Sequence, residues 1–490
     1  MNHVKKFFGQ FSDISVRIAW QFRRKVVILP PNRLFRQRVQ NAFCLHILKV
    51  MKRISFYICG ACVALMLTAC QGGKTAAGDA DGGDTVQMKY AQLLTIVRHG
   101  GEQGAENQGV GDAYDYAEAI IRNPWKEGSV LHRYILIPKG KEGDKTKALL
   151  AKRRGAAGGG ARCATDTVRT PVESSVVFTS PHCQLMYELG CQQAITGVCD
   201  LGYINIPDIK KRASAKNECA GEAKPIVDCG SSMAPDIERI IALHPEALLI
   251  SPFENSGGFG KLDKLRLPII ETADYMETSP LGRAEWMKFY GMLFGSARAD
   301  SLFTAIEKEY LWLKEQAKTL PKGLSILTER KTGGVWYVPG GQSTIGVLLK
   351  DANARYIFSE DTHSGSLAMS TEQILAKGKD IDIWAFKYFE PQPLTRPQLL
   401  QEYDGYKALF AFNSKNIYEC STSSQPYFEL TSFHPEILLR EFILLTHPAK
   451  SARFAKFAPA IQRLGHLRFY KEMTQADDLP VMDRTAECGK

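Results

Sequence analysis

Beyond residue 53 the sequence has almost no net charge. The 490 residues carry a formal net charge of +10, of which residues 1–50 supply +9 from ten Lys and Arg and one acid, Asp13. Lys52 and Arg53 add two more positive charges, so the rest of the chain sums to −1 (10 − 9 − 2). Nucleic-acid binding depends on a surplus of basic residues that neutralise phosphates. We therefore expect no nucleic-acid partner.

The sequence also lacks the short signatures of several enzyme classes. It contains no Gly-x-Ser-x-Gly nucleophile elbow, no Walker phosphate loop and no His-Glu-x-x-His metal helix. The spacings of its cysteines match no zinc template. We expect a protein without catalytic activity, without a resident cofactor and without metal ligands of its own.

No apolar run near the N-terminus is long enough to span a bilayer comfortably. Met51-Lys52-Arg53 is a basic start, and the apolar run Ile54–Leu67 ends in Leu67-Thr68-Ala69-Cys70. This segment resembles the lipobox of bacterial lipoproteins, in which a signal peptidase cuts before a cysteine that carries diacylglycerol. The resemblance implies lipidation at Cys70, an anchor in a membrane and a place in the cell envelope, on the periplasmic face. An ordinary secretory signal is the alternative.

Residues 1–50 do not fit this scheme, because a signal peptide has to lead the chain. We expect translation to start at Met51, with a cytoplasmic tail before a membrane anchor as the alternative. The Gly, Asp, Ala and Lys residues that follow Cys70 predict a flexible tether. An exported chain can oxidise its cysteines, so a disulfide among Cys199, Cys219 and Cys229 is expected, with its connectivity left open.

The stretch from Ser296 to Leu320 predicts one amphipathic helix. Apolar residues recur there at three- and four-residue steps, and Pro321 stops the pattern. Some twenty helical residues make a rod about 30 Å long. Because strands and helices alternate on both sides, we expect a strut between two α/β lobes.

The alternation predicts two Rossmann-like lobes with parallel sheets and a ligand cleft between them. The expected organisation is an extension at 1–50, a signal peptide at 51–69, a tether at 70–88, N-terminal strands with a Gly-rich loop at 89–171, lobe 1 at 172–295, the strut at 296–320, lobe 2 at 321–450, and a C-terminal helix and tail at 451–490. Within 89–171, Tyr90–Arg98 and His132–Pro138 are predicted strands, and Lys139–Arg169 is a predicted loop.

Two segments carry a family resemblance. Met233–Ser251 and Met369–Phe386 each lead from a helix bearing a Glu, through a turn, into a buried strand. With the lipobox and the strut, they resemble the binding proteins of ABC importers for ferric siderophores, haem and cobalamin, over about residues 172–450. The resemblance implies a monomeric protein that captures an iron complex and delivers it to a permease in the inner membrane.

The resemblance also implies contact residues for the permease. In that family each lobe presents a glutamate to arginines of the permease, and the matching positions here are Glu238 and Glu372. An acid in the first turn of a helix stays ionised beside the helix dipole, and two such charges fix orientation on a basic partner. The alternative is that both residues are ordinary first-turn acids in helix-capping arrangements.

The ligand-binding candidates lie in loops after predicted strands. Aromatic side chains there suit a large, partly planar ligand, cations and hydroxyl groups suit carboxylates or catecholates, and a His or Tyr could ligate haem iron. The candidates are His182, Glu254, Tyr275, Trp336, Tyr337, His363, Lys387 and Tyr388. His244 and His434, each before Pro-Glu, are expected to mark turns rather than ligands.

Two other functions compete with this interpretation. Leu93–Gly100 (LLTIVRHG) resembles the start of the histidine phosphatases, with Arg98-His99-Gly100 as the motif. No later predicted strand ends in the second His-Gly pair that those enzymes need. A surface scaffold lipoprotein without a small-molecule ligand is the other alternative.

Overall fold

The computed structural model describes residues 84–100, 114–141, 164–214, 224–254 and 258–473 of the chain. They all lie in one compact unit that spans Ala80–Lys490. The predicted extension, the signal peptide, Cys70 and most of the tether fall outside the described residues. Among the described helices, none combines the length and the apolar character that crossing a membrane requires.

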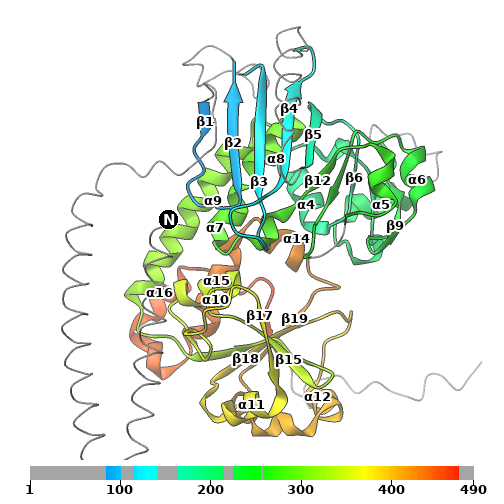
Figure 1. Cartoon of the computed structure of the whole chain (residues 1–490). Helices are drawn as coiled ribbons and strands as arrows, with labels where there is room; N and C mark the ends of the chain where they lie inside the picture. The colour runs from blue at the N-terminus through cyan, green and yellow to red at the C-terminus, as the bar shows by residue number, and fades with distance from the viewer. Residues whose placement is uncertain (1–83, 101–113, 142–163, 215–223, 255–257, 474–490) are drawn as a thin grey trace, which may run out of the picture. The chain divides into compact units, whose positions relative to one another are not determined.

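Helix α9 (Ala299–Thr319) is the continuous connector that the sequence predicts (Figure 1). It runs for 21 residues, and its inner face buries Phe303, Ile306, Tyr310 and Leu313. The helix stops at Leu320, which is extended, because the following Pro321 disfavours helical backbone. The Asn353 side-chain amide donates to the carbonyl of Leu320 at 3.0 Å, which satisfies one of the carbonyls left free at the helix end.

Lobe 1 (residues 172–295) contains a parallel sheet of five strands in the order β12-β11-β6-β7-β8. Three of its strands, β6, β11 and β12, are buried along their whole length, as expected where helices cover a parallel sheet. The strands are β6 (Ser175–Val177), β7 (Ile195–Val198), β8 (Val227–Asp228), β11 (Ala247–Ile250) and β12 (Ile269–Glu271), with the small hairpin β9 (Gly230–Ser231) and β10 (Ala234–Pro235). The helices are α4 (Ser180–Glu188), α5 (Pro207–Ser214), α6 (Ile237–Ala242), α7 (Pro280–Glu285) and α8 (Met287–Phe294).

Lobe 2 (residues 321–473) repeats this architecture with the order β16-β13-β18-β19-β20, in which only β20 is antiparallel. Its strands are β13 (Ser325–Thr328), β16 (Arg355–Tyr356), β18 (Ile383–Tyr388), β19 (Ile417–Ser421) and β20 (Lys471–Glu472), and β14 (Lys331–Thr332), β15 (Val335–Pro339) and β17 (Ser366–Ser370) form a separate antiparallel sheet. The helices are α10 (Thr344–Asp351), α11 (Thr371–Ala376), α12 (Arg396–Glu402), α13 (Phe410–Asn413), α14 (Tyr427–Thr431), α15 (Pro435–Thr446) and α16 (Ala458–Gln462).

Another five-stranded sheet precedes lobe 1 and is more extensive than predicted. It has the order β1-β2-β3-β4-β5, antiparallel except for the parallel pair β4 and β5. Its strands are β1 (Asp84–Val86), β2 (Leu94–His99), β3 (Tyr116–Arg122), β4 (Val130–Pro138) and β5 (Ala164–Thr170). Strand β5 corrects the prediction that all of Lys139–Arg169 is a loop, because its residues complete the sheet by pairing with β4 from His132 to Pro138.

The N-terminal sheet is joined to lobe 1 by hydrogen bonds to the edge strand β12. The Tyr134 hydroxyl donates to the carbonyl of Ile269 at 2.7 Å and accepts from the backbone N–H of Glu271 at 2.8 Å. Two buried carboxylates add further bonds. Glu277 accepts the backbone N–H groups of residues 92 and 93, and Glu285 accepts those of residues 89–91. Since an unpaired buried N–H is costly, these contacts fix the segment between β1 and β2.

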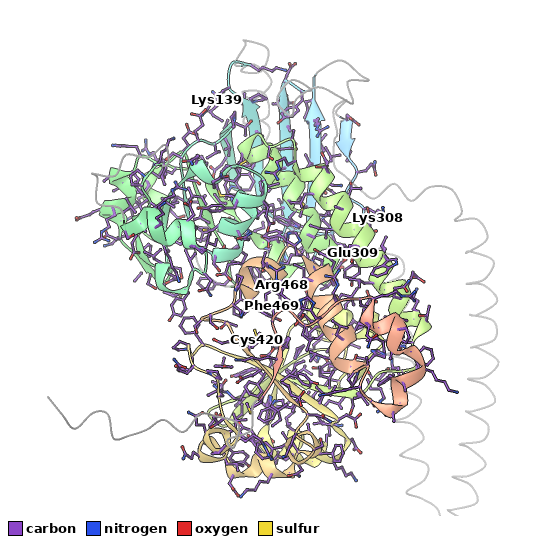
Figure 2. The ribbon with its side chains drawn as sticks, turned by 180° about the vertical axis from the view of Figure 1, so that it is seen from behind. Lys139, Lys308, Glu309, Cys420, Arg468 and Phe469 are labelled. Carbon is purple, nitrogen blue, oxygen red and sulfur yellow. The ribbon has the colours of Figure 1, made fainter. Side chains whose placement is uncertain are left out.

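One hydrophobic core runs through the N-terminal sheet, α9 and both lobes. In lobe 2 the buried Glu441 accepts the backbone N–H groups of Arg468, Phe469 and Tyr470. Arg468 and Phe469 are labelled in Figure 2, as is Cys420 on β19. This contact places the C-terminal segment so that β20 pairs with β19.

Candidate functional site

A cavity of about 440 Å³ lies between the two lobes. Lobe 1 contributes residues just beyond the carboxyl ends of β6 and β7, and lobe 2 contributes residues just beyond those of β18 and β19. The lining is Phe178, Thr179, Ser180, Pro181, Cys199, Asp200, Tyr203, Ile204, Ser232, Arg283, Phe389, Thr422, Phe428, Glu429 and Ser432. This confirms the predicted cleft between two α/β lobes, at the edge where ligands of such sheets bind.

Aromatic side chains from both lobes flank the cavity. The rings of Tyr203 and Phe389 lie with their centroids 4.8 Å apart. They are 61% and 47% exposed, although aromatic rings normally gain stability from burial. Phe428 of α14 also lines the cavity and is exposed. The three rings offer flat apolar faces to a ligand.

Hydrogen bonds cross from one lobe to the other beside the cavity. Asn205 of lobe 1 donates its backbone N–H to the Glu429 carboxylate at 2.9 Å and its side-chain amide to the carbonyl of Thr422 at 2.8 Å. On the lobe 1 side of the cavity, the Asp200 carboxylate accepts the backbone N–H of Ser232 at 3.2 Å. The hydrogen bonds from Asn205 to Glu429 and Thr422 therefore fix the position of one lobe relative to the other.

A buried ionic network supports the lobe 1 wall. Asp274 accepts from the Tyr290 hydroxyl at 2.9 Å, pairs with His182 at 2.9 Å and pairs with Nε of Arg283 at 3.2 Å. Burial alone would raise the pKa of Asp274, but His182 and Arg283 outweigh burial and lower it. The fully buried carboxylate therefore stays ionised and holds Arg283 at the cavity wall.

A second ionic pair lies in an adjoining cavity of about 300 Å³, which shares Arg283, Phe428 and Ser432 with the first. Lys387 forms an ion pair there with Glu329. Burial opposes the charge of Lys387, but the Glu329 carboxylate and Tyr427 outweigh it and raise the pKa of Lys387. Glu329 has a left-handed backbone (φ 68°), and the indole N–H groups of Trp336 and Trp384 hold its carbonyl at 3.1 and 2.8 Å. Such strained residues cluster at functional sites.

Some of the predicted ligand-binding residues line cavities or are exposed, and others are buried in the core. Lys387 lines the adjoining cavity, and Tyr337 lines a third one that also includes Glu329 and Ser364–Ser366. His363 precedes that lining, is exposed and bonds to Asp361. Glu254 and Tyr275 lie exposed beyond β11 and β12 and do not line the interlobe cavity.

Three predicted ligand residues lie in the core, which corrects the expectation for them. Trp336 is 0% exposed because β15 alternates, with Trp336 inward and Tyr337 outward. Tyr388 is buried because β18 extends through it. His182 is 3% exposed and is bonded to Asp274, Tyr290 and Thr179, so it is a structural residue behind the cavity wall.

The sequence interpretation missed several lining residues. Asp200 and Tyr203 lie just beyond the carboxyl end of β7, so the rule that selected the other loops would have found them. Arg283 and Glu429 lie on helices, and only the fold brings them to the cavity. His434, expected to mark a turn only, joins the lobes through Glu188 at 2.8 Å and Glu436 at 2.7 Å.

The remaining expectations concern the phosphatase motif, a disulfide and metals. His99 is 6% exposed, ends a strand and stacks on Tyr116 with centroids 4.5 Å apart. Cys199 and Cys229 are not joined by a disulfide and lie directly after the paired strands β7 and β8, with the sulfur of Cys199 3.9 Å from the carbonyl oxygen of Cys229. Cys219 lies outside the described residues.

Within the described ranges, no three His, Cys, Asp or Glu side chains gather as metal ligands would.

One family model and two named proteins match parts of the chain. Residues 184–423 match the family model described as periplasmic binding protein. Two uncharacterised lipoproteins of Methanocaldococcus jannaschii are 22% and 23% identical over 284 and 230 residues, which are 57% and 46% of this chain. The matches span 66% and 58% of these relatives, less than two thirds of either length.

The solved structures that match parts of the chain include three bacterial binding proteins. An ABC transporter substrate-binding protein of Listeria monocytogenes has 18% identity and a TM-score of 0.43, with 56% of this chain and 99% of that chain covered. A siderophore-binding protein of Vibrio cholerae with bound Fe3+-Desferal has 13% identity and a TM-score of 0.41, with 56% and 100% covered. A periplasmic haem-binding protein of Pseudomonas aeruginosa has 14% identity and a TM-score of 0.41, with 57% and 94% covered.

Proposed function

We propose that the chain is the substrate-binding lipoprotein of an ABC importer, because its residues 184–423 match the family model described as periplasmic binding protein. In this proposal it captures an iron complex and delivers it to a membrane permease. A ferric siderophore is the favoured ligand, and haem and cobalamin are the alternatives.

The observation that carries the proposal is the cavity between the lobes. Its walls come from the carboxyl ends of strands in both sheets, and Tyr203 and Phe389 meet across it with exposed faces. Exposed aromatic rings that line a concave site are typical of binding pockets for large, partly apolar ligands. The cavity and its neighbour share lining residues, so a ligand larger than either could extend through both.

The test is a spectrum followed by titration. The chain purified after its signal peptide has been removed is examined by absorbance and then titrated with haem, cobalamin and ferric chelates. The proposal predicts saturable binding of one class, and a Soret band would select haem. A folded protein that binds none of the three classes would overturn the proposal and favour a scaffold.

We propose Glu238 and Glu372 as the contacts for the permease. Each is exposed in the first turn of its helix, α6 or α11. The capping box of α11 uses Ser370 and Gln373, which leaves the Glu372 carboxylate turned to solvent. Hydrogen bonds from its own backbone and from Ser370 lower the pKa of Glu372, so the residue is ionised at neutral pH.

Charge reversal separates docking from ligand capture. The double variant Glu238→Lys with Glu372→Lys should abolish uptake by whole cells and leave ligand affinity unchanged, because neither residue lines a described cavity. The control is Asp300→Lys, a reversal of an exposed first-turn acid on α9. Normal uptake by the double variant would refute the docking role.

The proposed membrane anchor is the lipid on Cys70, which lies outside the described residues. Support comes from the lipobox Leu67-Thr68-Ala69-Cys70 and from relatives that are named lipoproteins. Mass spectrometry of the mature chain should find an N-terminal, lipid-modified cysteine. A mature chain that begins before Met51 would refute the predicted signal peptide.

A further inference from the structure

The charges around the cavity point to the kind of ligand it accepts. Three cationic side chains line the interlobe cavity, the adjoining cavity and the third cavity, and each has an anionic partner. Arg283 pairs with the fully buried Asp274 at 3.2 Å, Lys387 pairs with Glu329, and Arg330 pairs with Glu402 at 3.0 Å. Because a paired cation attracts a further anion only weakly, these residues supply little attraction for an anionic ligand.

Two carboxylates on the cavity wall have no such compensation. Asp200 and Glu429 both line the cavity, one from each lobe. Their hydrogen bonds come from neutral backbone N–H groups, those of Ser232 and Asn205. Among the ion pairs of the described ranges, neither carboxylate has a cationic partner. The wall therefore presents two negative charges that its own cations do not neutralise.

One feature of the cavity wall contributes positive charge. The amino end of α4, at Ser180 and Pro181, faces the cavity. A helix amino end is equivalent to about half a positive charge, and Pro181 removes one of its N–H donors. This is less than the charge of either carboxylate, so the wall remains negative on balance.

We infer that the ligand carries a positively charged group, such as an amine, that faces Asp200 and Glu429 across the cavity. This inference rests on the proposed function and narrows it. A ferric trihydroxamate with a free amine meets the requirement, whereas a trianionic ferric tricatecholate meets uncompensated negative charge. The inference reverses the sequence-based expectation that cations of the cleft hold carboxylates or catecholates.

The experiment compares ligands that differ in charge. Isothermal titration calorimetry measures three ferric complexes: a trihydroxamate with a free amine, the same compound with its amine acetylated, and a tricatecholate. Acetylation removes the positive charge and keeps the iron centre. We expect the amine form to bind about tenfold more tightly than the acetylated form. We also expect this preference to weaken as the salt concentration rises from about 50 to about 500 mM.

Variants assign the preference to the two carboxylates. Asp200→Asn and Glu429→Gln should each remove about half of the free-energy difference between the amine and acetylated forms. Both keep an acceptor oxygen for the backbone N–H that the carboxylate now receives. Asp300→Asn, an exposed acid on α9 outside the cavity, should leave the difference unchanged.

The outcomes separate this inference from the proposed function. If the acetylated form or the tricatecholate binds as tightly as the amine form or more tightly, the inference fails while the importer function stands. The inference also fails if Asp200→Asn and Glu429→Gln leave the preference intact. If no chelate, haem or cobalamin binds the folded protein, both the inference and the proposed function fail.

Discussion

The five-stranded sheets of lobe 1 and lobe 2 border the same cavity, but their strands lie in different orders. Numbered along the chain within each lobe, the strands of lobe 1 lie in the order 3-2-1-4-5 and those of lobe 2 in the order 2-1-3-4-5. Both orders are doubly wound, and each reverses direction at a point where a crevice opens. In lobe 2 this point lies between β13 and β18, where Glu329 and Lys387 form their pair.

The lobes also differ in how they cover the exposed edge of the sheet. An uncovered edge strand invites pairing with another chain. Lobe 2 covers β19 with its own C-terminal strand β20, which Glu441 fixes in place. Lobe 1 relies on the preceding sheet, because the Tyr134 hydroxyl occupies a backbone donor and acceptor of β12. Lobe 1 therefore depends on residues outside its own repeat of strands and helices.

The largest expected effect is in lobe 2. Glu441→Ala removes the acceptor of three buried backbone N–H groups, so the free energy of unfolding should fall by about 3 kcal/mol. Glu441→Gln keeps one acceptor oxygen and should cost less. Denaturant unfolding measures the change, and hydrogen exchange should show faster exchange at residues 468–470. An unchanged exchange rate there would contradict the role of Glu441.

The contact between the lobes should depend on pH through His434. Glu188 and Glu436 outweigh burial and raise its pKa to about 10. A raised folded-state pKa means that the stabilisation is complete below the unfolded value of about 6.5 and is lost as pH rises to about 10. Wild type should exceed His434→Gln by about 2 kcal/mol at pH 6, and the gap should close by pH 10. A gap that stays constant with pH would refute the charged pair.

The edge of lobe 1 gives a smaller effect. Tyr134→Phe removes one hydroxyl that bonds to β12, so the free energy of unfolding should fall by about 1 kcal/mol. The amide of Glu271 should also exchange faster with solvent. Tyr337→Phe is the control, because that side chain is exposed. Equal effects of the two substitutions would show that β12 does not depend on the N-terminal sheet.

The smallest effect concerns the aromatic pair that joins the lobes at the cavity. Tyr203→Ala and Phe389→Ala each remove one ring, and each should lower the affinity for the bound chelate about fivefold. Tyr203→Phe keeps the ring and should bind nearly as well as wild type. Titration of the four proteins compares the contributions of the lobes. Unaltered affinity in both alanine variants would place the ligand elsewhere.

The sequence predicted the features that depend on local patterns. The period of α9 and the stop at Pro321 are local, and so is the alternation of buried strands with helices in both lobes. The N-terminal sheet could not be predicted in full, because β4 and β5 pair across a Gly-rich, charged stretch. Its contact with lobe 1 joins residues 135 positions apart, Tyr134 and Ile269.

The sequence predicted where the candidate site lies, but it identified only some of the side chains around it. The rule about carboxyl ends of strands located the cavity, but errors of one or two residues changed which side chains face it. Strand β15 turns Trp336 inward and Tyr337 outward, and β18 continues to Tyr388, two residues beyond its predicted end. From the sequence, His182 was a candidate ligand-binding residue. The fold places it against Asp274, 92 positions away, and this contact lies in the core.

The most direct test of the interlobe site is to locate iron in crystals. Crystals of the mature protein, grown with a saturating ferric chelate, are measured at the iron absorption edge. The predicted result is one strong anomalous peak within the cavity bounded by Tyr203, Arg283 and Phe389, with Asp200 and Glu429 facing the chelate. A peak outside this cavity, or ligand-saturated crystals whose cavity holds no iron, would contradict the claim that the two lobes form one binding site.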